Sequence, residues 1–239
     1  VISRGAGRSA VAAAAYQSGE RLCNDYDGII HDYAKKGGVL FSEILLPDMA
    51  PAEWSDRQTL WNAVEDAEKS KDSRLARQLI VALPSELTLQ EWQPMLQQFV
   101  QEQCVSKGMC ADYAIHDTDG HNPHAHIMLT VRPLDDKGKW QAKTQKEYLC
   151  RRGDEEQGFT AAEFRQAQLD GWEKLYKYRD ENGAIGWFTP SDAVLHPEWE
   201  RTSKQPKATK FGRQNPICEA WNSEAQLLDW REHWAEYVN

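Results

Sequence analysis

The chain has 239 residues, which suits one large domain, or one domain with a sizeable insertion, and allows a proper hydrophobic core. Its formal net charge of -9 argues against a surface coated in positive charge for duplex DNA, although it leaves room for a local basic groove. The five cysteines include no Cys-x-x-Cys pair and no apolar run approaches membrane-spanning length, so we expect reduced thiols, a cytoplasmic location and no membrane insertion.

The N-terminal segment combines basic residues with a predicted helix. Ser9 is a suitable N-cap for the alanine-rich stretch that follows, and Gly19 is a suitable C-cap. Arg4 and Arg8 precede this helix together with two glycines, and such a helix N-terminus is a candidate anion-binding site. Tyr16 lies inside the helix, and on local sequence alone we predict that it packs in the core.

Apolar periodicity predicts the remaining elements. They are a strand at residues 39–46, a helix from about 50 to 70, a strand at 78–83, a helix at 89–107, strands at 109–115 and 124–132, a helix at 161–179 and a final helix at 226–237. Residues 21–38 are polar and turn-rich. Periodicity weakens between residues 141 and 220, which we interpret as an insertion within a single domain that spans residues 1–239.

Four of the seven histidines lie between residues 116 and 126, in a strand-turn-strand pattern. His124 and His126 are two residues apart at the start of the second strand, so their side chains point to the same face. His116 ends the preceding strand and can approach them across the turn. Three imidazoles that converge on one point, with other coordination positions open, indicate a catalytic rather than a structural metal site.

Such a site can hold several divalent metals. Imidazole favours Zn²⁺, Ni²⁺ or Cu²⁺, whereas sites that act on phosphate-bearing substrates often use Mg²⁺ or Mn²⁺. A bound metal would stabilise the charge that develops when a phosphodiester is attacked. The attacking group stays open at this point. Metal-bound water would make the protein an ordinary metallohydrolase, whereas a tyrosine needs a nearby base or positive charge, because its ordinary pKa is about 10.

A series of stretches matches one protein family in order and spacing, from residue 4 to about residue 139 and again in the closing helix. They are RGAGRSAVAAAAY at 4–16, DY at 32–33 with KGGV at 36–39, LWNAVE at 60–65, ALPSEL at 82–87, KGM at 107–109, and the histidine segment at 115–130 with NPHAH at 122–126. On these motifs the chain resembles the MobA/MobL (MobQ-class) conjugative relaxases of the HUH endonuclease superfamily, and TraA-like members in particular.

The resemblance implies an α+β fold, the HUH relaxase palm, with a central antiparallel sheet of about five strands flanked by helices. It implies a metal-dependent enzyme that nicks and rejoins one DNA strand at the origin of transfer of a plasmid or mobile element. By position, Tyr16 is the nucleophile that forms a covalent 5′-phosphotyrosyl intermediate. His116, His124 and His126 are the ligands of a divalent metal, expected to be Mg²⁺ or Mn²⁺ ahead of Zn²⁺ or Ni²⁺.

The resemblance also implies partners and further site residues. The partners are single-stranded origin DNA and the accessory and coupling proteins of a bacterial conjugation system. The DNA-phosphate contacts expected are Arg4, Arg8, Lys137, Lys139 and Lys143, and the candidates for an acid–base role or an outer contact to the ligands are Gln78, Asp117 and Asp119. Gln78 stands where many family members carry a glutamate. The chain begins at Val1 without a methionine, and TraA-like proteins often continue into a helicase region, so we expect a nicking domain from a longer protein.

Two other functions fit the same residues. A three-histidine metallohydrolase that uses metal-bound water would turn over without Tyr16 and leave no adduct. A non-catalytic module for single-stranded DNA would bind in a salt-dependent way that a chelator does not change, and it would have no use for three histidines. The relaxase hypothesis predicts in addition that the three histidines surround one point, and that the hydroxyl of Tyr16 reaches a phosphate bound there.

Overall fold

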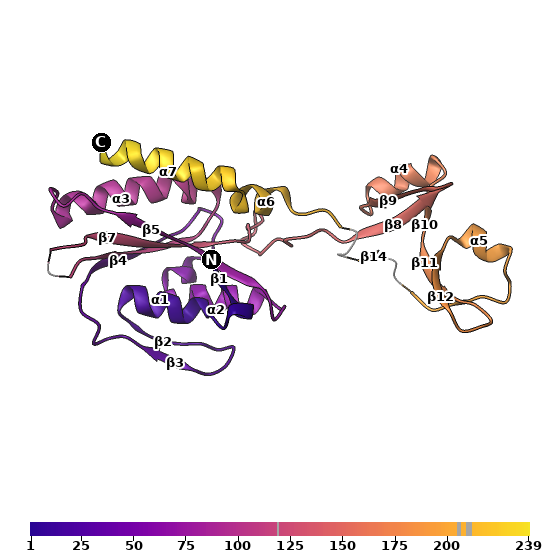
Figure 1. Ribbon diagram of the computed structural model, residues 1–239, viewed down its shortest axis with the longest axis horizontal. Coiled ribbons are helices and arrows are strands. Elements are labelled where there is room, and N and C mark those ends of the chain that lie inside the picture. Colours follow the sequence, from indigo (N-terminus) through magenta and orange to yellow (C-terminus); the bar gives the residue numbers. More distant parts are fainter. Residues whose placement is uncertain (119, 205–206, 209–211) are drawn as a thin grey trace. The chain divides into compact units, whose positions relative to one another are not determined.

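The computed structural model describes residues 1–118, 120–204, 207–208 and 212–239. The chain divides into two units, one formed by residues 1–141 and 217–239 and the other by residues 142–216. The first unit contains a five-stranded antiparallel sheet with the strand order β1-β5-β7-β6-β4 (Figure 1). Its strands are β1 (Ile2–Ser3), β4 (Val39–Leu45), β5 (Arg74–Ala82), β6 (Ala111–His116) and β7 (His124–Thr130).

Helices cover both faces of this sheet (Figure 1). One face packs against α1 (Ala10–Ser18) and α2 (Arg57–Ala67), and the other packs against α3 (Leu89–Gln103) and α7 (Glu224–Val238). The short helices of this unit are the 3₁₀ turns η1 (Arg4–Ala6), η2 (Ala52–Ser55) and η3 (Val105–Lys107), and α6 (Pro216–Asn222). The predicted α+β fold, with helices on both sides of a five-stranded antiparallel sheet, is confirmed.

The side chains of strand β7 alternate between two hydrophobic clusters, one on each face of the sheet. Its alternate residues Ile127 and Leu129 are fully buried in the cluster that includes α3 and α7, whereas Met128 is buried in the cluster that includes α1 and α2. Side chains two residues apart on a strand point to the same face. His124 and His126 therefore share the face of Met128, which is the face covered by α1 and α2.

The caps predicted for the first helix are present. The side chain of Ser9 accepts a hydrogen bond from the backbone of Ala12, and Gly19 adopts the left-handed conformation with φ 69°. The helix predicted at residues 50–70 is interrupted, because Asp56 adopts an extended conformation and caps α2 through Thr59. Only the short turn η2 precedes α2, so the prediction of one long helix was wrong. The residues predicted to form its apolar face are buried, as expected.

A buried ion pair joins α2 to the central sheet. The carboxylate of Asp112 on β6 is fully buried and accepts hydrogen bonds from the guanidinium of Arg57 (Nε–Oδ2 2.9 Å) and from the indole of Trp61 (2.7 Å). Glu20 contacts the outer part of the same guanidinium. A buried charge pair that keeps its hydrogen-bond partners is stable, but the loss of either member leaves the other charge uncompensated.

Asp112→Ala is expected to lower the free energy of unfolding by about 3–5 kcal/mol, because Arg57 would lose its buried carboxylate. Urea denaturation followed by circular dichroism measures this change. Asp66→Ala is the matched control, since Asp66 forms an exposed pair with Lys69 and such pairs contribute at most about 1 kcal/mol. Equal losses in the two variants would contradict this assignment.

The segment at residues 21–38 is more regular than its polar composition suggests. It forms the hairpin of β2 (Arg21–Cys23) and β3 (Ile30–Asp32), followed by a turn that leads into β4. Each strand has only three residues, and Leu22 is the only buried one among the six, so the sequence pattern carried no strand signal. The strand predicted at 78–83 begins four residues earlier, at Arg74.

The second unit consists of small sheets and short helices. Its elements are β8 (Glu147–Arg152), β9 (Glu155–Phe159), α4 (Glu163–Leu169), β10 (Glu173–Lys174), β11 (Tyr176–Arg179), β12 (Ile185–Phe188), α5 (Pro190–Val194), β13 (Glu200–Arg201) and β14 (Lys207–Ala208). The helix predicted at residues 161–179 was wrong beyond Leu169, because β10 pairs with β8 and β11 pairs with β12.

Two further expectations concern the whole chain. All five cysteines are free thiols, and burial raises the pKa of Cys104 and of Cys110 to about 12, so these two are unreactive. Within the residues that the structure describes, none of the helices has the length and apolar character needed to cross a membrane.

Candidate active site

The three histidines of the hairpin converge on the sheet face that α1 covers. In the register of β6 and β7, His116 lies directly opposite His124, and His126 lies two pairs further along, on the same face, opposite Ala114. One ring nitrogen from each lies within 4.8 Å of the other two. The ring centroids are 4.7–5.5 Å apart. The convergence expected from the spacing of these residues is therefore present.

Backbone carbonyls orient two of the three imidazoles. Nε2 of His116 lies 2.5 Å from the carbonyl oxygen of Gln17, and Nδ1 of His124 lies 2.7 Å from the carbonyl oxygen of Asn122. A carbonyl oxygen only accepts, so each of these nitrogens must carry the proton and donate it. The other nitrogen of each ring then keeps its lone pair, which is the arrangement found around metal-bound histidines.

Gln78 on β5 orients the third imidazole. Its amide nitrogen lies 3.3 Å from Nδ1 of His126, and because an amide nitrogen donates, Nδ1 accepts in this arrangement. Rotation of the amide by half a turn would present its oxygen instead, and Nδ1 would then donate and leave the lone pair of Nε2 of His126 available. An amide oxygen can thus do for this ring what a glutamate would do, but without adding negative charge to the site.

The environment favours the uncharged form of two of the three histidines, His116 and His126. Burial, followed by the neighbouring His116, His124 and Lys36, lowers the pKa of His126 to about 4. Burial is also the main reason why the pKa of His116 is lowered, and Lys36 and His124 add to it. Neutral imidazoles with convergent lone pairs are the form that binds a metal. The donor set of this chain therefore suits a divalent cation such as Mn²⁺ or Zn²⁺.

The lowered pKa of His126 predicts a loss of stability in acid when no metal is bound. At neutral pH this histidine is uncharged in both the folded and the unfolded state. As the pH falls below about 6.5, His126 becomes protonated in the unfolded chain. In the folded protein it stays neutral until about pH 4, so acid favours the unfolded state. The expected loss is roughly 2 kcal/mol after allowance for solvent screening. Urea denaturation in EDTA at about pH 7 and about pH 5 measures it, and His126→Asn should remove that part of the slope.

Tyr16 lies on the exposed side of α1, although its neighbour is deeply buried. The side chain of Tyr16 is 47% exposed, whereas Gln17 is fully buried. Gln17 fixes α1 to β6 at two points, because its amide donates to the carbonyl of Asp112 (2.9 Å) and its own carbonyl accepts from His116. The core packing predicted from local sequence for Tyr16 was wrong. The helix that carries this hydroxyl is hydrogen-bonded to one histidine of the trio.

Two side chains of the segment that follows β3 contact the ring of Tyr16. The ring of Tyr33 meets it edge-on, with the centroids 5.3 Å apart. The ammonium of Lys36 lies 4.5 Å from the centroid of the Tyr16 ring. The same ammonium is one of the charges that lower the pKa of His116 and His126. Lys36 therefore contacts the tyrosine ring, and its charge acts on two of the histidines.

The predicted acidic candidates have different outcomes. The backbone N–H of Asp117 donates to the carbonyl of Gly38 (2.9 Å), and Oδ1 of Asp117 is buried without a hydrogen-bond partner among the described residues. The groups that converge with the trio include no carboxylate among the described residues. Asp119 lies outside the described residues.

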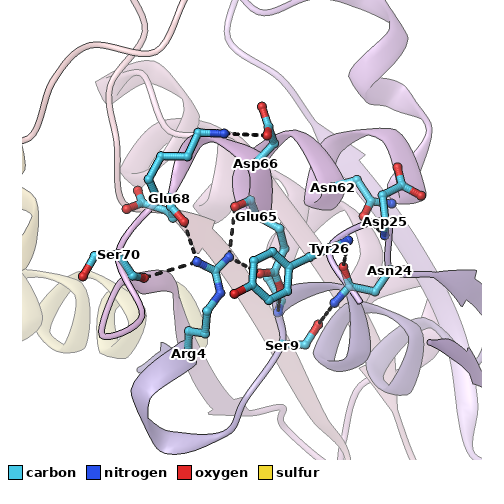
Figure 2. A network of polar contacts seen from close by, with 12 residues as sticks. Arg4, Ser9, Asn24, Asp25, Tyr26, Asn62, Glu65, Asp66, Glu68 and Ser70 are labelled. Carbon is cyan, nitrogen blue, oxygen red and sulfur yellow. Dashed lines mark hydrogen bonds and ion pairs between the residues drawn. The ribbon is translucent and has the colours of Figure 1, made fainter. Parts of the chain in front are cut away.

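The predicted anion site before α1 is filled by a carboxylate of the protein itself (Figure 2). The carboxylate of Glu65 on α2 accepts a hydrogen bond from the backbone of Ala10 (2.8 Å) and forms an ion pair with the guanidinium of Arg4 (2.8 Å). Figure 2 also shows the guanidinium of Arg4 hydrogen-bonded to the carbonyls of Glu68 and Ser70. The ring of Tyr26 covers it from the outside. The structure thus favours a structural role for Arg4 over the predicted phosphate contact.

The other predicted DNA contacts are spread over the chain. Arg8 is exposed in the segment that leads into α1. Lys137 and Lys139 are exposed in a turn whose backbone N–H groups donate to the carboxylate of Asp135 (2.9 Å each). Lys143 belongs to the second unit. Phosphate binding by these four residues stays a prediction.

Sequence reasoning missed Gln17 and Lys36. Gln17 follows the tyrosine in a helix of small residues, and only its contacts to β6 reveal its role. Lys36 lies in the matched KGGV stretch at residues 36–39, where one basic residue of a polar turn gave no chemical signal. Neither role could be read from the sequence, because the partners of both residues lie elsewhere in the chain.

These features define an α+β protein whose antiparallel sheet carries a three-histidine cluster beneath a helix with an exposed tyrosine. A family model described as the MobA/MobL family matches residues 8–239. The chain therefore belongs to the MobA/MobL family, and the membership predicted from its motifs is confirmed.

Similar proteins carry names from conjugation and mobilisation. The chain is 41% identical over 145 residues to a probable conjugal transfer protein TraA of Sinorhizobium fredii, which covers 56% of this chain and 13% of that protein. It is 40% identical over 151 residues to a probable mobilization protein MobA of Bifidobacterium longum, which covers 62% of this chain and 27% of that protein. The matches thus span about an eighth to a quarter of these relatives.

One solved structure shares the fold. It is described as "Molecular Basis of Vancomycin Resistance Transfer in Staphylococcus aureus" and superposes with a TM-score of 0.64 over all of this chain and 87% of that chain. The sequence identity is 24%, so the likeness concerns the fold alone.

Proposed function

We propose that this chain is the DNA-nicking (relaxase) domain of a conjugation or mobilisation protein. Its substrate would be single-stranded DNA at the origin of transfer of its own plasmid or mobile element. The observation that carries the proposal is the hydrogen bond between His116 and the carbonyl of Gln17, because it ties the histidine cluster to the residue beside the exposed Tyr16. The names of the similar proteins, which refer to conjugal transfer and mobilisation, support it.

In the proposed reaction the hydroxyl oxygen of Tyr16 attacks the phosphorus of one phosphodiester. A bond forms between this oxygen and phosphorus, and the bond from phosphorus to the 3′ oxygen breaks. The proton lost by the phenol is balanced by the one that the released 3′ hydroxyl gains. The protein keeps the 5′-phosphate as a tyrosyl ester, so the step is reversible and the strand can be rejoined.

The histidines would hold the divalent metal through the lone pairs that their backbone hydrogen bonds leave available. A metal bound there supplies positive charge next to the phosphate, where negative charge increases during the displacement. The part of this chain is to orient His116, His124 and His126 by hydrogen bonds, and to present Tyr16 on a fixed helix. Accessory and coupling proteins of a conjugation system are the partners that follow from this proposal.

Incubation with labelled single-stranded oligonucleotides that span the origin region of the same element tests the function. We expect a covalent protein–DNA adduct that survives denaturing electrophoresis and that EDTA prevents. Turnover to two free fragments with no adduct would indicate a metallohydrolase that uses metal-bound water. Binding that EDTA does not change, without any cleavage, would indicate a non-catalytic single-stranded DNA-binding module.

A further inference from the structure

Lys36 is held in place by the turn that leads into β4. Its backbone N–H donates to the carbonyl of Tyr33 (2.8 Å), and the carbonyl of Gly38 accepts from the backbone of Asp117 (2.9 Å). Gly38 has a φ of 80°, and a Cβ there would lie 2.7 Å from the hydroxyl of Thr118. The close approach therefore requires a glycine, and it fastens the Lys36 turn to the end of the strand that carries His116.

The ammonium of Lys36 has no carboxylate within salt-bridge distance in the described part of the chain. Its side chain is half-buried, and its nearest described partner is the face of the Tyr16 ring, 4.5 Å from the ammonium. Burial of a cation without a counter-charge costs free energy. A ring face compensates for this cost only in part.

The position of Lys36 is tied to the histidine cluster from two sides. Its turn is hydrogen-bonded to Asp117, the residue after His116, and the ring that it contacts belongs to Tyr16, whose neighbour Gln17 accepts from His116. A positive charge beside a cluster of metal ligands weakens binding of the cation alone. It helps once an anion joins the site, because a phosphate between two cations is attracted by both. The charge of Lys36 therefore suits binding of an anion at this site, and it does not suit the addition of another metal ligand.

We propose that Lys36 binds the phosphate that Tyr16 attacks. Its ammonium would donate a hydrogen bond to one non-bridging oxygen of that phosphate, and its contact with the ring would hold the phenol beside the phosphorus. This inference rests on the proposed function. The bonds made and broken are those of the nicking step, and Lys36 keeps its proton throughout. It stabilises the charge on the phosphate oxygens as they move toward the transition state.

The test compares Lys36→Met and Lys36→Arg with Lys35→Met. Lys35 is the exposed neighbour, so its replacement removes the same charge from the same turn. Adduct formation at a saturating concentration of the labelled origin oligonucleotide gives the rate of the chemical step. We expect Lys36→Met to slow this step by about 100-fold, as for the loss of one preorganised donor. We expect Lys36→Arg to stay within about tenfold of the unmodified protein, and Lys35→Met to have little effect.

Two readouts do not depend on nicking. In a Tyr16→Phe background, the salt dependence of oligonucleotide binding should decrease by about 0.7 in log–log slope for Lys36→Met, as for the loss of one phosphate contact on a single strand. Calorimetric titration with Mn²⁺ alone should show about three- to tenfold tighter binding to Lys36→Met, because a repulsive charge is removed. Lys35→Met should change neither quantity.

The outcomes separate this inference from the proposed function. If the unmodified protein forms no adduct, the proposed function fails, and the salt slope then decides whether Lys36 contacts a phosphate. A salt slope unchanged from that of Lys35→Met would overturn the inference. Tighter Mn²⁺ binding by Lys36→Met with an unchanged rate of adduct formation would overturn it as well, since Lys36 would then act only on the metal. A slower step with a reduced slope supports it.

Discussion

Tyr16→Phe is expected to abolish the covalent protein–DNA adduct, with a fall in the rate of adduct formation of roughly 10⁴-fold or more, as when a catalytic nucleophile is removed. The ring and its contacts with Tyr33 and Lys36 would remain, because only the hydroxyl is lost. The side chain is 47% exposed, so the fold should not change. Denaturing electrophoresis after incubation with the labelled origin oligonucleotide measures the adduct.

The matched control for this experiment is Tyr33→Phe, which removes a hydroxyl from the ring that touches Tyr16. We expect it to form adduct at close to the unmodified rate. Calorimetric Mn²⁺ binding should be the same in Tyr16→Phe as in the unmodified protein, because no histidine is altered. If Tyr16→Phe still becomes covalently attached to DNA, another residue is the nucleophile and the proposed chemistry is wrong.

His126→Ala is expected to weaken Mn²⁺ binding by more than the 10- to 100-fold typical of changes in the groups around metal ligands, because it removes a ligand itself. Adduct formation should fall with it, and a higher Mn²⁺ concentration should restore only part of the rate. His126 is the best of the three to replace, because its contact is with the side chain of Gln78. His116 holds α1 through the carbonyl of Gln17, so its loss would also disturb the helix.

His121→Ala provides the control for the metal experiment, since His121 lies exposed in the turn between the same two strands and is not part of the cluster. It should bind Mn²⁺ and form adduct like the unmodified protein. Circular dichroism should give the same spectrum for both variants. Equal Mn²⁺ affinity in His126→Ala and His121→Ala would mean that the trio does not hold the metal.

Much of the first unit could be predicted because its signals are local. The caps of α1 at Ser9 and Gly19 follow from residue chemistry within a few positions. The common face of His124 and His126 follows from the two-residue repeat of a strand. The second unit was harder, since its strands are short and its sheets small, and the supposed helix beyond Leu169 is a set of strands that pair across the unit.

The contacts of the arginine before α1 show the limit of local reasoning. The sequence correctly indicated that a helix N-terminus flanked by Arg4 attracts an anion, but not which anion. In the structure the anion is the carboxylate of Glu65, which is 55 positions away from Ala10 in the sequence. The distinction between a ligand site and an internal ion pair depends on whether a distant carboxylate packs there.

The sequence by itself determined the family, the α+β fold with helices flanking an antiparallel sheet, and the convergence of the three histidines, because motif order, strand alternation and turn position are properties of neighbouring residues. Only the tertiary structure decided that Tyr16 is exposed, that Gln17 joins its helix to His116 across 99 positions, and that Lys36 contacts the ring of Tyr16. These relations arise from packing between elements that are far apart in the chain. The partner of a buried polar or charged group is chosen by that packing, and no short stretch of sequence contains both members.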